Sequence, residues 1–148
     1  MVYRLYLETV KKNNEIAWAY TFYNHQDFLV YKRAGITCDS SEEQVILEQS
    51  ATALQYFESC MRRRYYDEHF STRIDEDYVT LYTPLKDIVN AANIIKEDDP
   101  NKSDSSGNGD IWHKLIPFFK QKTMAFEVSS EERFINAARE LANKQFEK

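Results

Sequence analysis

The side chains that could do chemistry in this chain do not fall into compact catalytic motifs. Three histidines, His25, His69 and His113, lie far apart and lack metal-ligand spacing. With only three glycines, the chain contains neither a G-x-G-x-x-G sequence nor a Walker loop that could hold a phosphate. Cys38 and Cys60 do not form a C-x-x-C pair, so we expect both to be reduced thiols. Cys60 lies on the predicted buried face of a helix, as a core residue.

Cations beside aromatic rings form the one candidate binding cluster. Three consecutive arginines are followed by tyrosine, a combination that contacts phosphates and stacks on bases. The candidate nucleic-acid-binding residues are Arg62, Arg63, Arg64 and Tyr65, together with Lys32 and Arg33. The net charge of −5 argues against general nucleic-acid binding. Termination of a helix by the three arginines is the alternative interpretation.

The composition indicates one domain that spans residues 1–148. Hydrophobic residues make up 43% of the chain, enough for a core. No apolar run approaches the roughly 20 residues of a membrane helix, and no signal pattern begins the sequence. We therefore expect a cytoplasmic protein without a membrane association. Residues 96–110 are acidic, rich in serine and nearly free of apolar side chains, and they predict a mobile loop.

Alternating apolar residues predict three strands at the start of the chain, over 2–10, 15–23 and 28–36. Polar turns of about four residues separate them, which favours an antiparallel meander. A helix over 40–64 follows, opened by a capping box from Ser40 to Glu43. Its predicted buried stripe comprises Ile46, Leu47, Ser50, Ala53, Leu54, Phe57, Cys60 and Met61.

A strand that runs directly into a helix organises the second half. The strand begins at Tyr78 and ends at Pro84, which cannot donate to a ladder, and the helix begins at Leu85. A short helix that contains Trp112, a strand over 123–128 and a last helix opened by Ser129 and Ser130 follow. The order βββ-α-β-α-α-β-α predicts an α/β fold with a five-stranded mixed sheet flanked by helices.

That order resembles the ribonuclease H type I family over nearly the whole chain. The similarity is strongest at residues 81–91 (LYTPLKDIVNA), and it recurs at 112–115 and 138–142. The resemblance implies a ribonuclease-H-like fold. It also implies four carboxylates at one end of the sheet, which hold two Mg²⁺ ions for cleavage of RNA in RNA–DNA hybrids.

The first two ligand positions of the family keep a carboxylate here. The resemblance places the acid of the first strand at Glu8. The acid of the first helix falls on Glu43 or Glu48. The residues around Glu48 match the family's sequence pattern better than those around Glu43. On a helical wheel, however, Glu48 lies with Thr52 and Gln55, away from the buried stripe. We therefore prefer Glu43, for which helix capping is the alternative role.

The other two ligand positions of the family lack a carboxylate. The strand-four acid falls on Pro84, which has no side-chain oxygen, with Asp87 one turn further on as a partial substitute. The acid of the last helix falls on Arg139. Glu131 or Glu132 could approach from the start of that helix, although capping explains both equally well.

We therefore expect a catalytically inactive, degenerate ribonuclease-H-like domain that acts as a protein-interaction, structural or nucleic-acid-associated module. No cofactor is expected. The candidate catalytic remnants are Glu8, Glu43 and Asp87, of which Glu8 and Glu43 would bind Mg²⁺ or Mn²⁺ if the protein is active. Expected partners are another protein or a second copy, with an RNA–DNA hybrid as a further candidate. The alternative is a divergent metal-dependent ribonuclease H.

Overall fold

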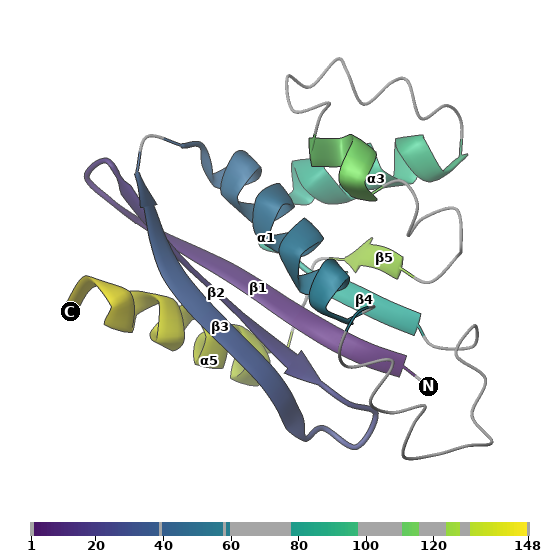
Figure 1. The fold of residues 1–148 in the computed structure, drawn as a ribbon, viewed down its shortest axis with the longest axis horizontal. Coiled ribbons are helices and arrows are strands. Elements are labelled where there is room, and N and C mark those ends of the chain that lie inside the picture. Colours follow the sequence, from purple (N-terminus) through teal and green to yellow (C-terminus); the bar gives the residue numbers. More distant parts are fainter. Residues whose placement is uncertain are drawn as a thin grey trace.

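A mixed sheet lies between helices in the computed structural model (Figure 1). The structure describes residues 2–38, 40–57, 59, 78–97, 111–115, 124–127 and 131–147. The strands are hydrogen-bonded in the order β3-β2-β1-β4-β5. Four of them, β3-β2-β1-β4, make up the body of the sheet. Short β5 (Met124–Glu127) pairs with the outer side of β4.

The first three strands form the antiparallel meander that the sequence predicts. β1 (Val2–Lys12) pairs with β2 (Glu15–Tyr23), which pairs with β3 (Leu29–Cys38). β1 and β3 each extend two residues past their predicted ends, because the ladder with β2 continues to the β1–β2 turn. Asn24 closes the β2–β3 turn: its side-chain oxygen accepts from the backbone N–H of Gln26 and Phe28, at 2.9 and 3.1 Å.

The strand-to-helix unit around Pro84 is also as predicted. β4 (Tyr78–Tyr82) runs parallel to β1, and α3 (Lys86–Glu97) begins four residues after the strand ends. Between them, the Thr83 hydroxyl accepts from the backbone N–H of Leu85 at 3.3 Å. Since α3 continues to Glu97, the first two residues of the predicted acidic loop are helical. The rest of that loop lies outside the described residues.

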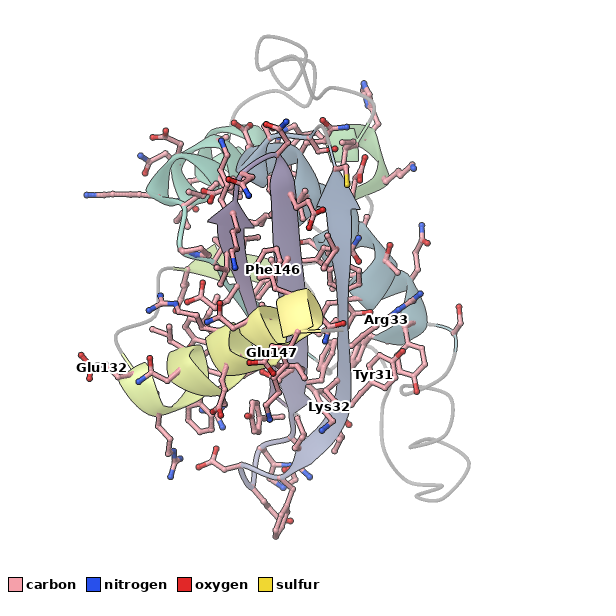
Figure 2. The ribbon with its side chains drawn as sticks, turned by 90° about the vertical axis from the view of Figure 1, so that its left-hand side faces the viewer. Tyr31, Lys32, Arg33, Glu132, Phe146 and Glu147 are labelled. Atoms are coloured by element: carbon pink, nitrogen blue, oxygen red, sulfur yellow. The ribbon has the colours of Figure 1, made fainter. Side chains whose placement is uncertain are left out.

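The alternation of side chains along β1 divides the core between two faces of the sheet. Leu5 and Leu7 point to the face covered by α1 (Glu42–Tyr56), α3 and the helical residues 111–115. Tyr6 points to the opposite face, where it packs against Phe134 of α5 (Glu132–Asn143). Figure 2 shows α5 and the following turn η4 (Lys144–Glu147) crossing that face in front of the strands. The candidate site belongs to the α5 face.

Two predicted helix starts need correction. The N-cap of α1 is Ser41, whose hydroxyl accepts from the backbone N–H of Gln44 at 3.1 Å, so the cap lies one residue after the predicted Ser40. The N-cap of α5 is Glu131, and its side chain makes no capping hydrogen bond. The last helix therefore begins at Glu132, later than the start predicted at Ser129 and Ser130, which lie outside the described residues.

The first long helix keeps its predicted stripe as far as the structure describes it. Its predicted inward residues from Ile46 to Phe57 are buried, whereas Cys60 and Met61 lie outside the described residues. α1 covers Glu42–Tyr56, residues 57 and 59 continue in π-helical geometry, and the predicted end at residue 64 lies outside the described residues. Among the helices that the structure describes, none is long and apolar enough to cross a membrane.

Candidate functional site

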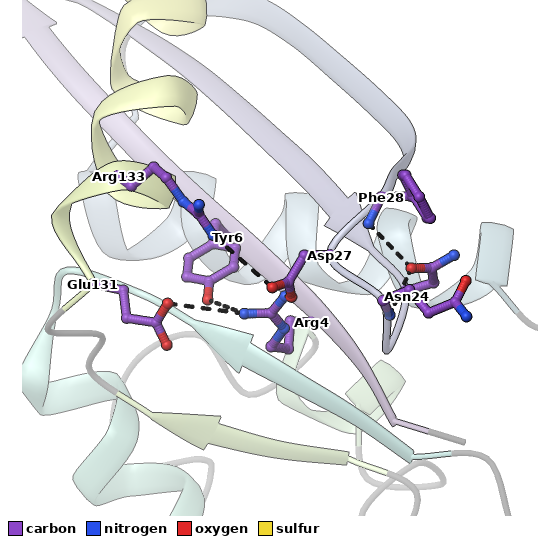
Figure 3. A network of polar contacts seen from close by, with 8 residues as sticks. Arg4, Tyr6, Asn24, Asp27, Phe28, Glu131 and Arg133 are labelled. Atoms are coloured by element: carbon purple, nitrogen blue, oxygen red, sulfur yellow. Dashed lines mark hydrogen bonds and ion pairs between the residues drawn. The ribbon is translucent and has the colours of Figure 1, made fainter.

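An arginine network fixes the start of α5 against the sheet (Figure 3). Arg4 of β1 pairs with Asp27 in the β2–β3 turn, donates to the Tyr6 hydroxyl at 3.2 Å and lies 4.0 Å from Glu131. Its guanidinium also lies 4.7 Å from the ring centroid of Phe134. Because these contacts join β1, the turn and the first residues of α5, they set the position of the side chains further along that helix.

Three stacked aromatic rings lie next to this network, on the same face of the sheet. Tyr6 and Tyr82 are paired neighbours on β1 and β4, and their rings stack with centroids 4.7 Å apart. Phe134 stacks on the other side of Tyr6 at 4.9 Å. Burial raises the pKa of Tyr6 to about 12, against the opposing effect of Arg4, and burial also raises the pKa of Tyr82. Both hydroxyls therefore stay protonated at neutral pH.

A pocket of about 160 Å³ opens beside these rings, at the end of β4. Three of the positions that the family resemblance assigns to metal ligands meet there: Glu8, Pro84 and Arg139. The pocket is also lined by Tyr6, Leu7, Tyr82, Thr83 and Ile135. The sequence separation of these residues means that only the folded sheet and α5 bring them together.

The Glu8 carboxylate forms an ion pair with Arg139. One guanidinium nitrogen of Arg139 donates to Oε1 of Glu8 at 3.1 Å. The Glu8 side chain is only 5% exposed, whereas that of Arg139 is 50% exposed. The second carboxylate oxygen, Oε2, is buried and has no hydrogen-bond partner among the described residues. Arg139 is thus the one cation that the described structure places on this carboxylate.

Burial raises the pKa of the Glu8 carboxyl above its ordinary value, and the charge and hydrogen bond of Arg139 only partly oppose that rise. The cause is desolvation, which penalises a carboxylate more than a carboxylic acid. A buried ion pair recovers that penalty only when its geometry satisfies both partners. Here Oε2 of Glu8 has no hydrogen-bond partner among the described residues, so the ion pair offsets the penalty of burying this carboxylate only in part.

Pro84 follows β4 and lies in the wall of the Glu8 pocket. The parallel register pairs Tyr6 with Tyr82, the last residue of β4, and Pro84 comes two residues after that strand ends. Glu8 and Pro84 both line the pocket. Proline has no side-chain oxygen. At this position the pocket is therefore lined by the carbon atoms of the proline ring, whereas the family resemblance implies a carboxylate.

The other candidate carboxylates do not line this pocket. Glu43 lies in the first turn of α1, on the opposite side of the sheet from the Glu8–Arg139 pair. Glu48 shares a separate hollow with Thr52 and Gln55, as the helical wheel predicts, and accepts from Gln44 at 3.3 Å. Asp87 is exposed in the first turn of α3. The structure therefore does not gather Glu8, Glu43 and Asp87 in one pocket.

The acids at the start of α5 lie outside the pocket. Glu131 lies near Arg4, as described above, and Glu132 is exposed on the outer side of the helix (Figure 2). Neither lines the pocket. Glu131 is the N-cap residue of α5, but its side chain makes no capping hydrogen bond and lies near Arg4 instead.

The candidate nucleic-acid-binding residues divide into two groups. Lys32 and Arg33 are exposed neighbours on β3 (Figure 2), but they face opposite sides of the sheet because successive strand residues alternate. They therefore do not form one patch. The other four, Arg62, Arg63, Arg64 and Tyr65, lie outside the described residues.

The donor set around Glu8 does not fit a divalent cation. Mg²⁺ takes oxygen ligands, several of them anionic. The pocket offers one carboxylate, already paired with a guanidinium, and a proline. Across the described part of the chain, no three His, Cys, Asp or Glu side chains lie close enough to share a metal ion.

Comparison with solved structures identifies the fold. The crystal structure of RNase H1 from the halophilic archaeon Halobacterium salinarum NRC-1 matches 99% of this chain and 98% of its own, with a TM-score of 0.65 and 12% identity. The chain has a ribonuclease-H-like fold. LC11-RNase H1 in complex with RNA/DNA hybrid matches 98% of this chain and 96% of its own, with a TM-score of 0.60 and 11% identity.

A viral enzyme contains a similar ribonuclease-H-like unit. Native prototype foamy virus protease-reverse transcriptase matches 97% of this chain through 20% of its own length, with a TM-score of 0.64 and 8% identity. No family model and no curated protein matches the sequence. At these identities the likeness establishes the ribonuclease-H-like fold, and the predicted fold class is confirmed at that level.

Several pocket residues were missed by sequence reasoning. Tyr6, Tyr82 and Ile135 were assigned to strands and a helix but not to the site. The alternation of β1 does place Tyr6 on the same face as Glu8, and one helical turn separates Ile135 from Arg139, so these two were within reach. The stack of Tyr82 on Tyr6 depends on the parallel register, which the sequence does not give.

Proposed function

We propose that this chain is a catalytically inactive ribonuclease-H-like domain that serves as a binding module. The observation that carries the proposal is the Glu8–Arg139 ion pair in the pocket beside Pro84. In the family that the sequence resembles, these three positions hold carboxylates on Mg²⁺. Here a guanidinium supplies the positive charge that a metal ion would supply to Glu8.

Electrostatics supports the loss of metal-dependent hydrolysis. A dication near Glu8 would meet the charge of Arg139 at short range in a half-buried site, where repulsion is weakly screened. Without two bridged metal ions, neither the attacking water nor the leaving oxygen of a phosphodiester is activated. The ion pair leaves the scaffold intact, so a binding role is compatible with the fold.

A hybrid-cleavage assay tests the proposal. We expect the purified chain to leave a labelled RNA–DNA hybrid uncut in Mg²⁺ or Mn²⁺, because the pocket lacks the carboxylates that would hold the metals. Cleavage above background that is abolished by Glu8→Gln, and retained by the exposed control Glu132→Gln, would establish the alternative of a divergent ribonuclease H.

Nucleic acid is one candidate ligand of the module, as the hybrid bound by LC11-RNase H1 suggests. In the described structure, Arg33 follows Tyr31 by two residues on β3, which puts both on one face of the sheet, and Tyr31 stacks on Tyr56 with ring centroids 3.9 Å apart. Such a site binds strands by stacking and charge. Filter binding at low salt tests whether nucleic acid is a ligand. If the chain binds the hybrid no more tightly than an acidic control protein does, nucleic acid is excluded and a protein partner remains.

A further inference from the structure

The edge of the sheet at β3 combines a long regular strand with exposed apolar side chains. β3 contains ten residues, and in the described part of the chain no strand pairs with its outer side. Its ladder with β2 keeps one register from Tyr31 to Cys38, without a bulge that would twist the edge away. A sheet edge of this kind is a template for another extended segment.

Apolar side chains flank the middle of this edge. Leu29 is 47% exposed, Val30 is 43% exposed and Ile36 is 39% exposed, while Phe28 in the adjoining turn is 63% exposed. They account for all the large hydrophobic residues found exposed in the described residues. These exposed apolar side chains lie together at one edge of the sheet and are not scattered over the surface, which indicates a contact region.

The charge of the edge opposes that of the whole molecule. The chain carries a net charge of −5, yet residues 29–38 contain Lys32 and Arg33 and no acidic residue. Both cations are exposed, one on each face of the sheet, at the centre of the strand. Lys32 therefore presents positive charge on one face of the edge, and Arg33, which also interacts with the Tyr20 hydroxyl, presents it on the other.

A second copy of this chain does not suit the edge. Two β3 strands paired antiparallel about a two-fold axis near the strand centre, the arrangement that pairs most of their length, would place both copies of Lys32 and Arg33 close to that axis. Like charges on facing strands destabilise a sheet. The favoured occupant instead carries carboxylates at the centre and apolar residues at its ends.

From this complementarity we propose that the outer edge of β3 binds an extended peptide segment of another protein, acidic at its centre and apolar on both sides. The segment adds a strand to the sheet, so that backbone hydrogen bonds supply affinity and Lys32 and Arg33 supply register and selectivity. The inference deepens the interaction role proposed above by naming the partner class. It does not depend on the pocket at Glu8.

Peptide binding by fluorescence anisotropy tests the inference. The probe is a labelled eight-residue peptide with adjacent Glu and Asp at its centre and valine and threonine elsewhere. We expect saturable binding, weakened about tenfold or more by Lys32→Glu/Arg33→Glu, because charge pairs across an interface control selectivity. That variant should in turn bind a peptide with two central lysines.

Two controls separate strand addition from general attraction. Lys86→Glu/Lys114→Glu makes the same change in net charge at exposed helical positions and should leave binding unchanged. N-methylation of alternate peptide amides on one edge should abolish binding to that edge, since it removes the backbone donors. Circular dichroism confirms that each variant is folded.

Three results would overturn the inference. They are an absence of saturable binding by the acidic peptide, equal losses in the two double variants, and no effect of N-methylation on either peptide edge. A wild-type dimer in light scattering that Lys32→Glu/Arg33→Glu alters would assign the edge to a second copy instead. None of these readouts depends on hybrid cleavage, so this inference and the proposed loss of catalysis fail separately.

Discussion

At the scale of single residues, the account depends on how Glu8 is compensated. Its carboxylate is almost fully buried, accepts one hydrogen bond from Arg139, and has a second oxygen without a partner among the described residues. The sequence predicted the position of Glu8 and the presence of a positive charge at Arg139. It did not predict their contact, because a pairing across 131 positions follows from tertiary packing.

The pH dependence of stability should reveal the cost of this buried carboxylate. Burial raises the folded-state pKa of Glu8 above the unfolded value. Its stabilising contribution is therefore complete below the unfolded pKa and is lost as the pH rises through the folded pKa. We expect Glu8→Gln, which cannot ionise, to be more stable than the wild type at pH 7, because the neutral amide avoids the cost of a buried carboxylate.

Urea denaturation at several pH values measures this difference. The gain of Glu8→Gln should shrink as the pH falls through the raised pKa of Glu8, because the wild-type carboxyl then becomes protonated in the folded state. Glu132→Gln, at an exposed position of α5, should show little change at any pH. If Glu8→Gln is instead less stable than the wild type at pH 7, the ion pair stabilises the fold and the assignment of a net burial cost is wrong.

At the scale of elements, sequence patterns located strands and helices but not all of their ends. Period-two alternation located β1 and β2, and the bounds of β2 agree with the prediction at both ends. Helix starts were harder, because two adjacent serines offer alternative caps of similar quality. The structure selects Ser41 for α1, since its hydroxyl reaches the N–H of Gln44.

A pair of serine variants tests the selected cap. Ser41→Ala should lower the free energy of unfolding by about 1 kcal/mol, because the hydrogen bond to Gln44 is lost. Ser40→Ala is the matched control: its hydroxyl makes only a long 3.5 Å contact to the carbonyl of Cys38. The control should stay within about 0.5 kcal/mol of the wild type. A larger loss in Ser40→Ala than in Ser41→Ala would restore the capping box of the sequence prediction.

At the scale of the whole molecule, the sequence was enough to predict the fold but not the arrangement of the candidate site. The order of elements was sufficient to predict the ribonuclease-H-like fold, which the solved structures confirm at 8 to 12% identity. The proline at position 84 and the arginine at position 139, where the family resemblance implies carboxylates, are also visible in the sequence. Their placement in one pocket with Glu8 required the parallel β1–β4 register and the docking of α5 through Arg4.

Mn²⁺ titration by isothermal calorimetry tests most directly whether Arg139 stands in place of a metal ion. The wild type should show no saturable binding, whereas Pro84→Asp/Arg139→Asp, which returns two carboxylates to the pocket and removes the guanidinium, should bind Mn²⁺. Saturable binding by the wild type, as tight as that of the double variant and lost in Glu8→Gln, would contradict the account.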